Sequence, residues 1–142
     1  MKERKIKKQY LIGGQALLKL GSPRNTDDYD YLTEVDSDLN FVNDTKNNVD
    51  YVNANGHPFF REVFDLMTGV QEIASPQALL ELKAFSFVQH CQNGNWAKAN
   101  NDEFDIKFIV RTLGVKEIKI AHKFISAGEL AEVNKVIQSE NR

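Results

Sequence analysis

One stretch of sequence decides the fold of this chain: Tyr10–Leu32, which reads YLIGGQALLKLGSPRNTDDYDYL. At its start, the residues Gln9–Ile12 are largely apolar and favour a β-strand, and they are followed directly by Gly13-Gly14. The leucine-rich segment that follows predicts a short helix ending at Gly21, because glycine readily adopts the left-handed conformation found after helix C-termini. Asp28–Thr33 then predicts a second strand with a polar start.

The rest of the chain adds two more strands and a series of helices. Leu39–Val42 and Val49–Val52 predict strands that pair as a hairpin, because the turn between them is rich in Asn and Asp. Gln92–Asn101 is predicted as a loop, and Ser126 as the cap of the last helix. The predicted helices are Pro58–Met67, Pro76–Gln92 (capped by Ser75), Phe104–Leu113 (stopped by Gly114), Lys116–Phe124 and Ala127–Gln138.

Strands that come first and helices that come later indicate an α+β fold rather than a doubly wound parallel sheet. We therefore expect a small mixed sheet in the N-terminal half, with helices packed on it, and a helical C-terminal half. A length of 142 residues suits one domain. Residues 1–142 are predicted to form that domain, with the sheet-containing catalytic core in 1–70 and the helical part in 71–142.

Composition narrows the class of protein. A net charge of -2 gives no general attraction for nucleic acid. The local basic run Lys2–Lys8 fits either a solvated tail or first helical turn, or a segment that binds a nucleic acid or a phosphate-rich ligand. Cys91 is the single cysteine, which excludes an internal disulfide and a cysteine metal cluster. No apolar run reaches membrane-span length and no signal-peptide pattern follows the start, so we expect a cytoplasmic protein with no membrane partner.

The acidic segment after Pro23 is the first candidate for chemistry. On a strand, alternate residues share a face, so Asp28 and Asp30 point the same way and Arg24 and Thr26 roughly continue the row. Two neighbouring carboxylates repel each other unless a cation neutralises them, and Mg²⁺ prefers such oxygen ligands together with substrate phosphates. For the aspartate pair alone, a solvated acidic turn is the favoured interpretation, because Asp-rich segments are common at loop ends.

Gly13-Gly14 adds weight to the metal-site interpretation. A diglycine between a strand and a helix allows the backbone to approach a ligand closely, and a helix N-terminus offers N–H groups to an anion. An ordinary strand-to-helix turn is the alternative for the glycines by themselves. A phosphate-facing turn followed by a metal-binding strand is the hypothesis that accounts for both features.

These residues together carry a family resemblance. The pattern Leu11-Ile12-Gly13-Gly14-Gln15-Ala16-Leu17 followed by Arg24-x-Thr26-x-Asp28-x-Asp30 resembles the signature of the polymerase-beta-type nucleotidyltransferase superfamily. Within it, the chain looks like the small bacterial and phage nucleotidyltransferase-like proteins that include abortive-infection toxins. The resemblance implies that Asp28 and Asp30 bind a catalytic Mg²⁺ (or Mn²⁺), and that a third metal-binding carboxylate lies on a later strand. Asp50 is the best match for it, ahead of Asp36, Asp38 and Asp44, which lie in predicted loops.

The resemblance also implies a set of nucleotide-binding residues. They are Gly13, Gly14, Gln15, Arg24, Thr26 and Lys83. The segment Ser75–Lys83 is similar to a helix of these proteins, and Lys83 is its last residue. The segment Lys98–Ile106 is similar to a later segment of theirs, and its Asp105 is expected to pair with a lysine or arginine. Gln15 departs from the family pattern, because a Ser or Thr usually stands at that position.

The implied reaction is transfer of a nucleoside monophosphate from an NTP to an acceptor, with release of pyrophosphate. RNA, protein and a small molecule remain open as acceptors. Two alternatives remain as well: a catalytically inactive nucleotide- or protein-binding module of toxin/antitoxin type, and a structural or antitoxin-type partner that binds no nucleotide. The three histidines have no spacing typical of a zinc site and are interpreted as ordinary residues.

Overall fold

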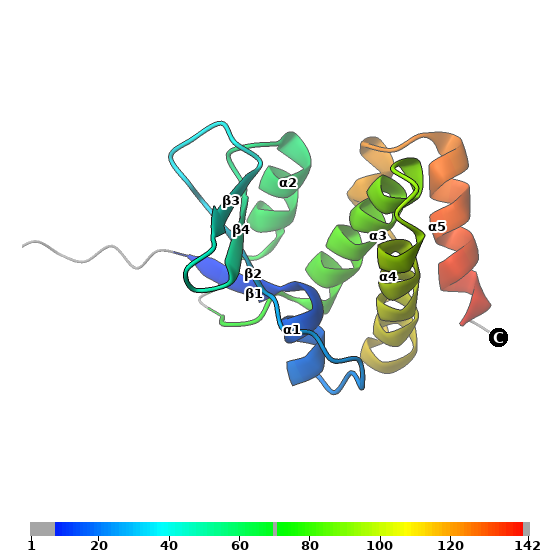
Figure 1. The fold of residues 1–142 in the computed structure, drawn as a ribbon. Coiled ribbons are helices and arrows are strands. Elements are labelled where there is room, and N and C mark those ends of the chain that lie inside the picture. The colour runs from blue at the N-terminus through cyan, green and yellow to red at the C-terminus, as the bar shows by residue number, and fades with distance from the viewer. Residues whose placement is uncertain (1–7, 70, 141–142) are drawn as a thin grey trace, which may run out of the picture.

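The computed structural model describes residues 8–69 and 71–140 and has an α+β fold (Figure 1). The N-terminal half holds a four-stranded mixed sheet, and the C-terminal half is helical, as predicted. The strands are β1 (Gln9–Ile12), β2 (Tyr29–Thr33), β3 (Phe41–Asp44) and β4 (Val49–Asn53). The helices are α1 (Gly13–Lys19), α2 (Pro58–Leu66), α3 (Pro76–Gln92), α4 (Trp96–Phe108) and α5 (Ala127–Ser139).

The sheet has the strand order β1-β2-β4-β3. β2 is antiparallel to β1 and parallel to β4, and β3 and β4 form an antiparallel hairpin. The register places Asp30 of β2 beside Ile12 of β1 on one side and Asp50 of β4 on the other. Two acidic residues distant in sequence therefore lie next to each other in the middle of the sheet.

Local sequence explains where the helices begin. At α2, the His57 ring accepts a hydrogen bond from the Phe59 N–H, and Pro58 occupies the first turn, where its missing N–H costs nothing. At α3, Ser75 accepts from the Ala78 N–H. At α5, Ser126 and Glu129 form a reciprocal capping box. These caps confirm the predicted starts of the three helices.

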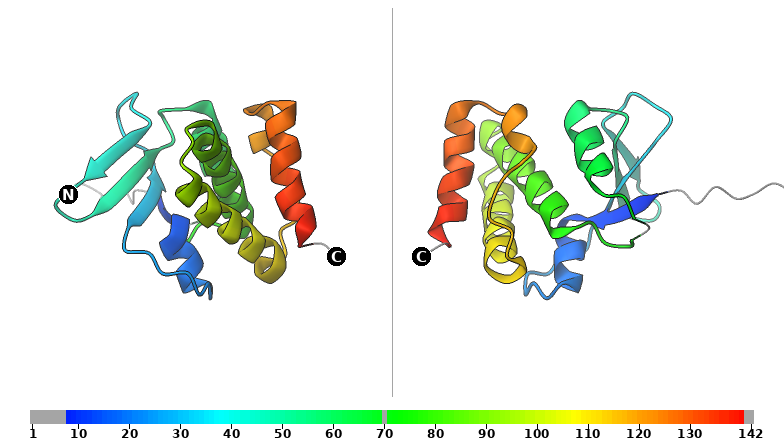
Figure 2. Two further views of the ribbon diagram at one scale, coloured as in Figure 1. Left: turned by 45° about the vertical axis from the view of Figure 1, so that its right-hand side comes forward. Right: turned by 180° about the vertical axis from the view of Figure 1, so that it is seen from behind.

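The molecule has two layers. The sheet forms one layer and the helices the other: α2 packs on the sheet and on α3, while α4 and α5 lie on the side of α3 away from the sheet (Figures 1 and 2). The core between α2 and α3 is strongly aromatic: Phe59 stacks on Phe85 with ring centroids 4.2 Å apart, and Phe124 meets Phe59 edge-on. α3 is therefore the central helix, and its sheet-facing side is the one available to a site on the sheet.

The predicted loop Gln92–Asn101 is wrong, because α4 begins inside it at Trp96. Asn95 caps the helix by accepting a hydrogen bond from the Lys98 N–H at 3.4 Å. Asparagine favours both turns and N-caps, so an Asn-rich segment can begin a helix as well as interrupt one. At its other end α4 continues through a π-helical turn, Ile109–Leu113, and stops at Gly114 with φ 75°, as predicted.

The predicted helix Lys116–Phe124 is also wrong, apart from one 3₁₀ turn at Ala121–Lys123. The side chain of Glu81, fully buried on α3, accepts hydrogen bonds from the backbone N–H groups of Lys119, Ile120 and Ala121 at 2.7, 3.1 and 2.8 Å. These donors are thus bound by a side chain instead of a helical carbonyl. Long-range capture by Glu81 overrides the local helical pattern.

Two further expectations concern membrane-spanning helices and the basic run near the start of the sequence. Across residues 8–69 and 71–140, no helix combines the length and apolar character needed to cross a membrane. The basic run Lys2–Lys8 lies, except for its last residue, outside the described residues.

Candidate active site

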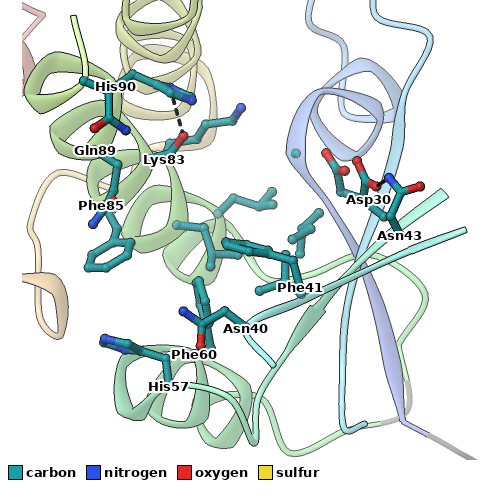
Figure 3. A pocket seen from close by; sticks show the side chains of 18 residues that line it. Asp30, Asn40, Phe41, Asn43, His57, Phe60, Lys83, Phe85, Gln89 and His90 are labelled. Carbon is teal, nitrogen blue, oxygen red and sulfur yellow. Dashed lines mark hydrogen bonds between the residues drawn. The ribbon is translucent and has the colours of Figure 1, made fainter. Parts of the chain in front are cut away.

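A pocket of about 660 Å³ opens between the sheet and α3 (Figure 3). Asp30 of β2 and Asp50 of β4 line one side, and Lys83 and His90 of α3 line the other. The remaining end is aromatic, with Phe41, Phe60 and Phe85 among the lining residues. The pocket thus combines a carboxylate wall, a basic wall and an apolar end.

The carboxylate wall follows directly from strand register. Asp30 and Asp50 are partners in the parallel β2–β4 pair, so their side chains leave the same face of the sheet side by side. Asn43, the partner of Asp50 on β3, donates a hydrogen bond from its side-chain amide to the Asp50 carboxylate. The structure therefore brings together two of the three predicted carboxylates.

The electrostatics of Asp30 reflect this crowding. Burial and the neighbouring charge of Asp50 raise the pKa of Asp30 to about 6, with a smaller contribution from Asp28, while Lys83 opposes the rise. Ionising Asp30 beside a second carboxylate costs free energy, and a cation bound between the two carboxylates would lower that cost.

Asp28 lies at the margin of this wall. It is exposed, immediately before β2, and its carboxylate is 3.5 Å from the Asn48 amide, which also donates to the Asp27 carbonyl. Within the described ranges, no three His, Cys, Asp or Glu side chains are grouped closely enough to hold a metal ion. Asp30 and Asp50 fit one divalent cation that takes its other ligands from water or phosphate, as Mg²⁺ commonly does.

The two glycines are required by close packing. Gly13 has φ 70°, and a Cβ atom on it would lie 2.7 Å from Oδ2 of Asp30. A Cβ on Gly14 would lie 2.6 Å from Cγ2 of Thr26 and 3.1 Å from a guanidinium nitrogen of Arg24. The diglycine therefore allows α1 to start directly against the carboxylate wall, and Gly13 also lines the pocket.

Gln15 and Thr26 are engaged with each other rather than with the pocket. The Gln15 side chain is buried and donates from Nε2 to the Thr26 carbonyl oxygen at 2.6 Å. Neither residue lines the pocket. This bond fixes the segment leading into β2, so both residues position Asp30, and their direct contact with nucleotide stays a prediction.

Arg24 and Lys83 share a carboxylate partner. Arg24 forms a bidentate pair with Asp105, with nitrogen–oxygen distances of 2.9 and 2.6 Å, and this bonding raises the pKa of Arg24. Lys83 lies 3.0 Å from the same carboxylate and 3.5 Å from Asp102. The expected pairing of Asp105 with a basic residue is confirmed. Lys83 lines the pocket and Arg24 does not.

His90 is the site residue that the sequence interpretation missed. Its Nδ1 lies 2.6 Å from Oδ2 of Asp102, and Ser86 donates to the same oxygen at 2.9 Å. The pairing depends on α3 and α4 being adjacent helices, so that residues twelve apart in sequence meet. The mistaken loop at Gln92–Asn101 concealed it, since Asp102 faces α3 only once α4 begins at Trp96.

The aromatic end of the pocket was missed too. Phe41 is 61% exposed although it lies beside Phe60, and His57 packs on Phe60 and Phe85. Such an accessible aromatic surface is suited to stacking on a planar ring. No local motif marks it, because its members come from β3, α2 and α3.

Comparison with known proteins adds no relative: no protein-family model, no curated protein and no solved structure matches this chain.

Proposed function

We propose that this protein is a metal-dependent nucleotidyltransferase that moves a nucleoside monophosphate from an NTP to an acceptor hydroxyl. One observation carries the proposal: Asp30 and Asp50 lie side by side on adjacent strands, across a pocket from Lys83. At about 660 Å³ the pocket is within the usual range for small-molecule sites. Its carboxylate wall, basic wall and aromatic end correspond to the metal, the phosphates and the base of a nucleotide.

The chemistry assigns a task to each wall. Asp30 and Asp50, with Asp28 at the margin, would hold Mg²⁺ or Mn²⁺, which would neutralise charge on the phosphates. The acceptor oxygen forms a bond to the α-phosphorus, the bond from that phosphorus to the bridging oxygen breaks, and pyrophosphate leaves with the bonding electron pair. Asp50, oriented by Asn43, takes up the hydroxyl proton. Lys83 attracts the phosphates.

Labelling with α-³²P NTPs tests the reaction. Wild-type protein with Mg²⁺ should release pyrophosphate and retain label on an acceptor or on itself, while Asp30→Asn and Asp50→Asn should lose at least about a hundredfold of the rate. Asp38→Asn is the matched control, because Asp38 is exposed and does not line the pocket. Equal labelling by wild type and an Asp30→Asn/Asp50→Asn double variant would refute the proposal.

A pair of glycine variants tests the geometry of the same wall. Gly13 and Gly94 have nearly the same φ, 70° and 69°, but a Cβ on Gly94 meets nothing within 4 Å. Both alanine variants should lose similar stability to backbone strain, roughly 1 kcal/mol. Gly13→Ala should in addition abolish Mg²⁺-dependent turnover because its methyl group displaces Asp30, whereas Gly94→Ala should retain it. Retained turnover in Gly13→Ala would contradict the claim that a Cβ atom at this position disturbs the metal site.

The second candidate function is a binding module that holds a nucleotide without turnover. Gln15 favours it, because the similar nucleotidyltransferases usually carry a phosphate-binding Ser or Thr at that position, whereas the buried Gln15 amide is bonded to Thr26. Asp28 favours it as well, because it lies at the margin of the carboxylate wall, beside the Asn48 amide. Calorimetry distinguishes the two functions: the module binds Mg²⁺–NTP with no release of pyrophosphate. If no NTP with Mg²⁺ raises the melting temperature, the third possibility, a partner that binds no nucleotide, is favoured.

A further inference from the structure

We propose that His90 is a phosphate-binding residue whose protonation controls the affinity of the pocket for the polyphosphate chain of a nucleotide. The inference rests on the proposed function in one respect, since it takes the pocket to be a nucleotide site. It adds a ligand group, a residue and a pH dependence that the metal site does not require.

The first step concerns the orientation of the imidazole. Asp102 is almost fully buried, and its Oδ2 lies 2.6 Å from Nδ1 of His90 and accepts a hydrogen bond from Ser86. An ionised carboxylate can only accept, so Nδ1 carries the proton of that bond. Among the described residues no hydrogen bond engages Nε2, which is the nitrogen left for the pocket that His90 lines.

The second step concerns charge. Behind the basic wall, two cations, Lys83 and Arg24, face two carboxylates, Asp102 and Asp105, so these four charges balance. The proton on His90 therefore decides whether this cluster presents a net positive charge.

The third step concerns the form of the ring that meets the ligand. In the protonated ring Nε2 donates a hydrogen bond into the pocket, and in the neutral ring it presents a lone pair, because Nδ1 keeps its proton for Asp102. Phosphate oxygens accept hydrogen bonds and are repelled by a lone pair. Binding of a polyphosphate should therefore be strong with protonated His90 and weak with neutral His90.

The surroundings support a phosphate ligand at this wall. Gln89, the residue before His90, and Asn93, three residues after it at the C-cap of α3, also line the pocket and carry amide donors. The carboxylates that face His90 from the opposite wall are Asp30 and Asp50, and Figure 3 shows Lys83 reaching toward Asp30 from the α3 side. A metal-bound polyphosphate placed between the walls would meet the metal on one side and the donors of α3 on the other.

The test compares binding of inorganic tripolyphosphate with Mg²⁺ to wild type and His90→Gln by calorimetry at pH 6 and pH 8.5. Charged hydrogen bonds are worth enough that we expect wild type to bind roughly tenfold more tightly at pH 6, with the ratio falling to about one at pH 8.5. Taking the ratio at each pH removes the common titration of Asp30 and of the ligand. His122→Gln is the control, because His122 is exposed and does not line the pocket.

A second measurement on the wild-type protein does not depend on a folded variant. Nuclear magnetic resonance of the histidine rings should show the pKa of His90 rising when tripolyphosphate binds, because a ligand that prefers the protonated ring stabilises it. A non-hydrolysable ATP analogue should produce the same rise at lower concentration, because its base can use the aromatic end. Equal rises at equal concentrations would assign the site to polyphosphate itself and remove the nucleotide from the inference.

Failure of this inference and failure of the proposed function have different signatures. An unchanged His90 pKa together with a wild-type-to-variant ratio near one at both pH values overturns the inference, even if pyrophosphate is released from NTPs. A shifted His90 pKa without any pyrophosphate release supports the phosphate site and overturns the transferase. The binding module would then be the function of the pocket.

Discussion

At the scale of single residues, the pKa of Asp30 makes the carboxylate wall measurable without a ligand. Its pKa is about 6 in the folded protein against an ordinary value of 3.8. The folded state therefore binds this proton more tightly than the unfolded state, so the contribution to stability is fully present below about pH 4 and is lost as pH rises through 6. At neutral pH, the ionised Asp30 side chain therefore lowers the free energy of unfolding of the metal-free protein.

Removing the charge should therefore stabilise the metal-free protein. In the presence of EDTA at pH 7 to 8, Asp30→Asn is expected to raise the free energy of unfolding by about 2 kcal/mol, since a tenfold change in acid dissociation corresponds to about 1.4 kcal/mol. The difference from wild type should shrink toward pH 4. Urea unfolding monitored by circular dichroism at several pH values measures it.

The matched control is Asp44→Asn, on the edge strand β3 and outside the pocket. Its free energy of unfolding should show no comparable gain with pH. A wild-type protein that is more stable than Asp30→Asn at pH 8 and less stable at pH 4 would contradict the assigned sign.

How much of the site the sequence could predict also becomes clear residue by residue. Asp30, Asp50, Gly13 and Lys83 follow from strand alternation and short motifs, and all four line the pocket. His90 could not be predicted in this way, because its partner Asp102 is brought to it only by the packing of α4 on α3. Contacts between helices leave little trace in local spacing, whereas contacts along a strand or across a tight turn do.

At the scale of elements, the same distinction separates the predictions that hold from those that do not. α2, α3 and α5 are marked by caps within a few residues of their starts, and their starts were predicted correctly. The apolar residues of Lys116–Phe124 are spaced as in a helix. Three of its backbone N–H groups nevertheless donate to Glu81, some forty residues away. A side chain from another element cannot be inferred from the segment that it binds.

Glu81 is therefore expected to be a main anchor of the C-terminal segment. Glu81→Gln replaces one acceptor oxygen by an NH₂ group, which would face backbone donors instead of accepting from them. We expect a loss of roughly 3 kcal/mol in the free energy of unfolding, because two charge-assisted bonds are lost inside the protein. Chemical denaturation measures the loss.

Hydrogen exchange locates the same effect. The amides of Lys119, Ile120 and Ala121 should lose protection in Glu81→Gln, while those of α2 should change little. Glu132→Gln on the exposed face of α5 is the control and should change neither stability nor exchange measurably. Retained protection at the three amides would show that this segment is held by packing rather than by Glu81.

At the scale of the whole molecule, one ionic cluster joins the sheet half to the helical half. Arg24, in the segment before β2, is paired with Asp105 of α4, and Lys83 of α3 reaches the same carboxylate. The Asp105 side chain is 1% exposed, so its charge depends on both partners. The cluster also lies behind the pocket, and the two layers must stay together for the carboxylate and basic walls to face each other.

Asp105→Asn should therefore weaken both halves at once. It leaves Arg24 and Lys83 without their shared charge, and breaking a buried pair in this way costs roughly 3–5 kcal/mol. The sequence offers a separate probe for each half: all four tyrosines lie between Tyr10 and Tyr51, in the sheet half, while α3, α4 and α5 supply most of the helical signal. Tyrosine absorbance and circular dichroism at 222 nm should give one coincident unfolding transition in wild type, and should move to lower denaturant together in the variant.

Asp65→Asn is the matched control, because Asp65 is exposed and pairs with Arg61 on the surface of α2, where an ion pair is worth little. Separate transitions for the tyrosine and helix signals would show that the halves fold independently and that the ionic cluster only joins them. Coincident transitions, shifted by Asp105→Asn and not by Asp65→Asn, would make residues 8–140 one cooperative unit. The pocket would then exist only in the fully folded protein, since its two walls come from different layers.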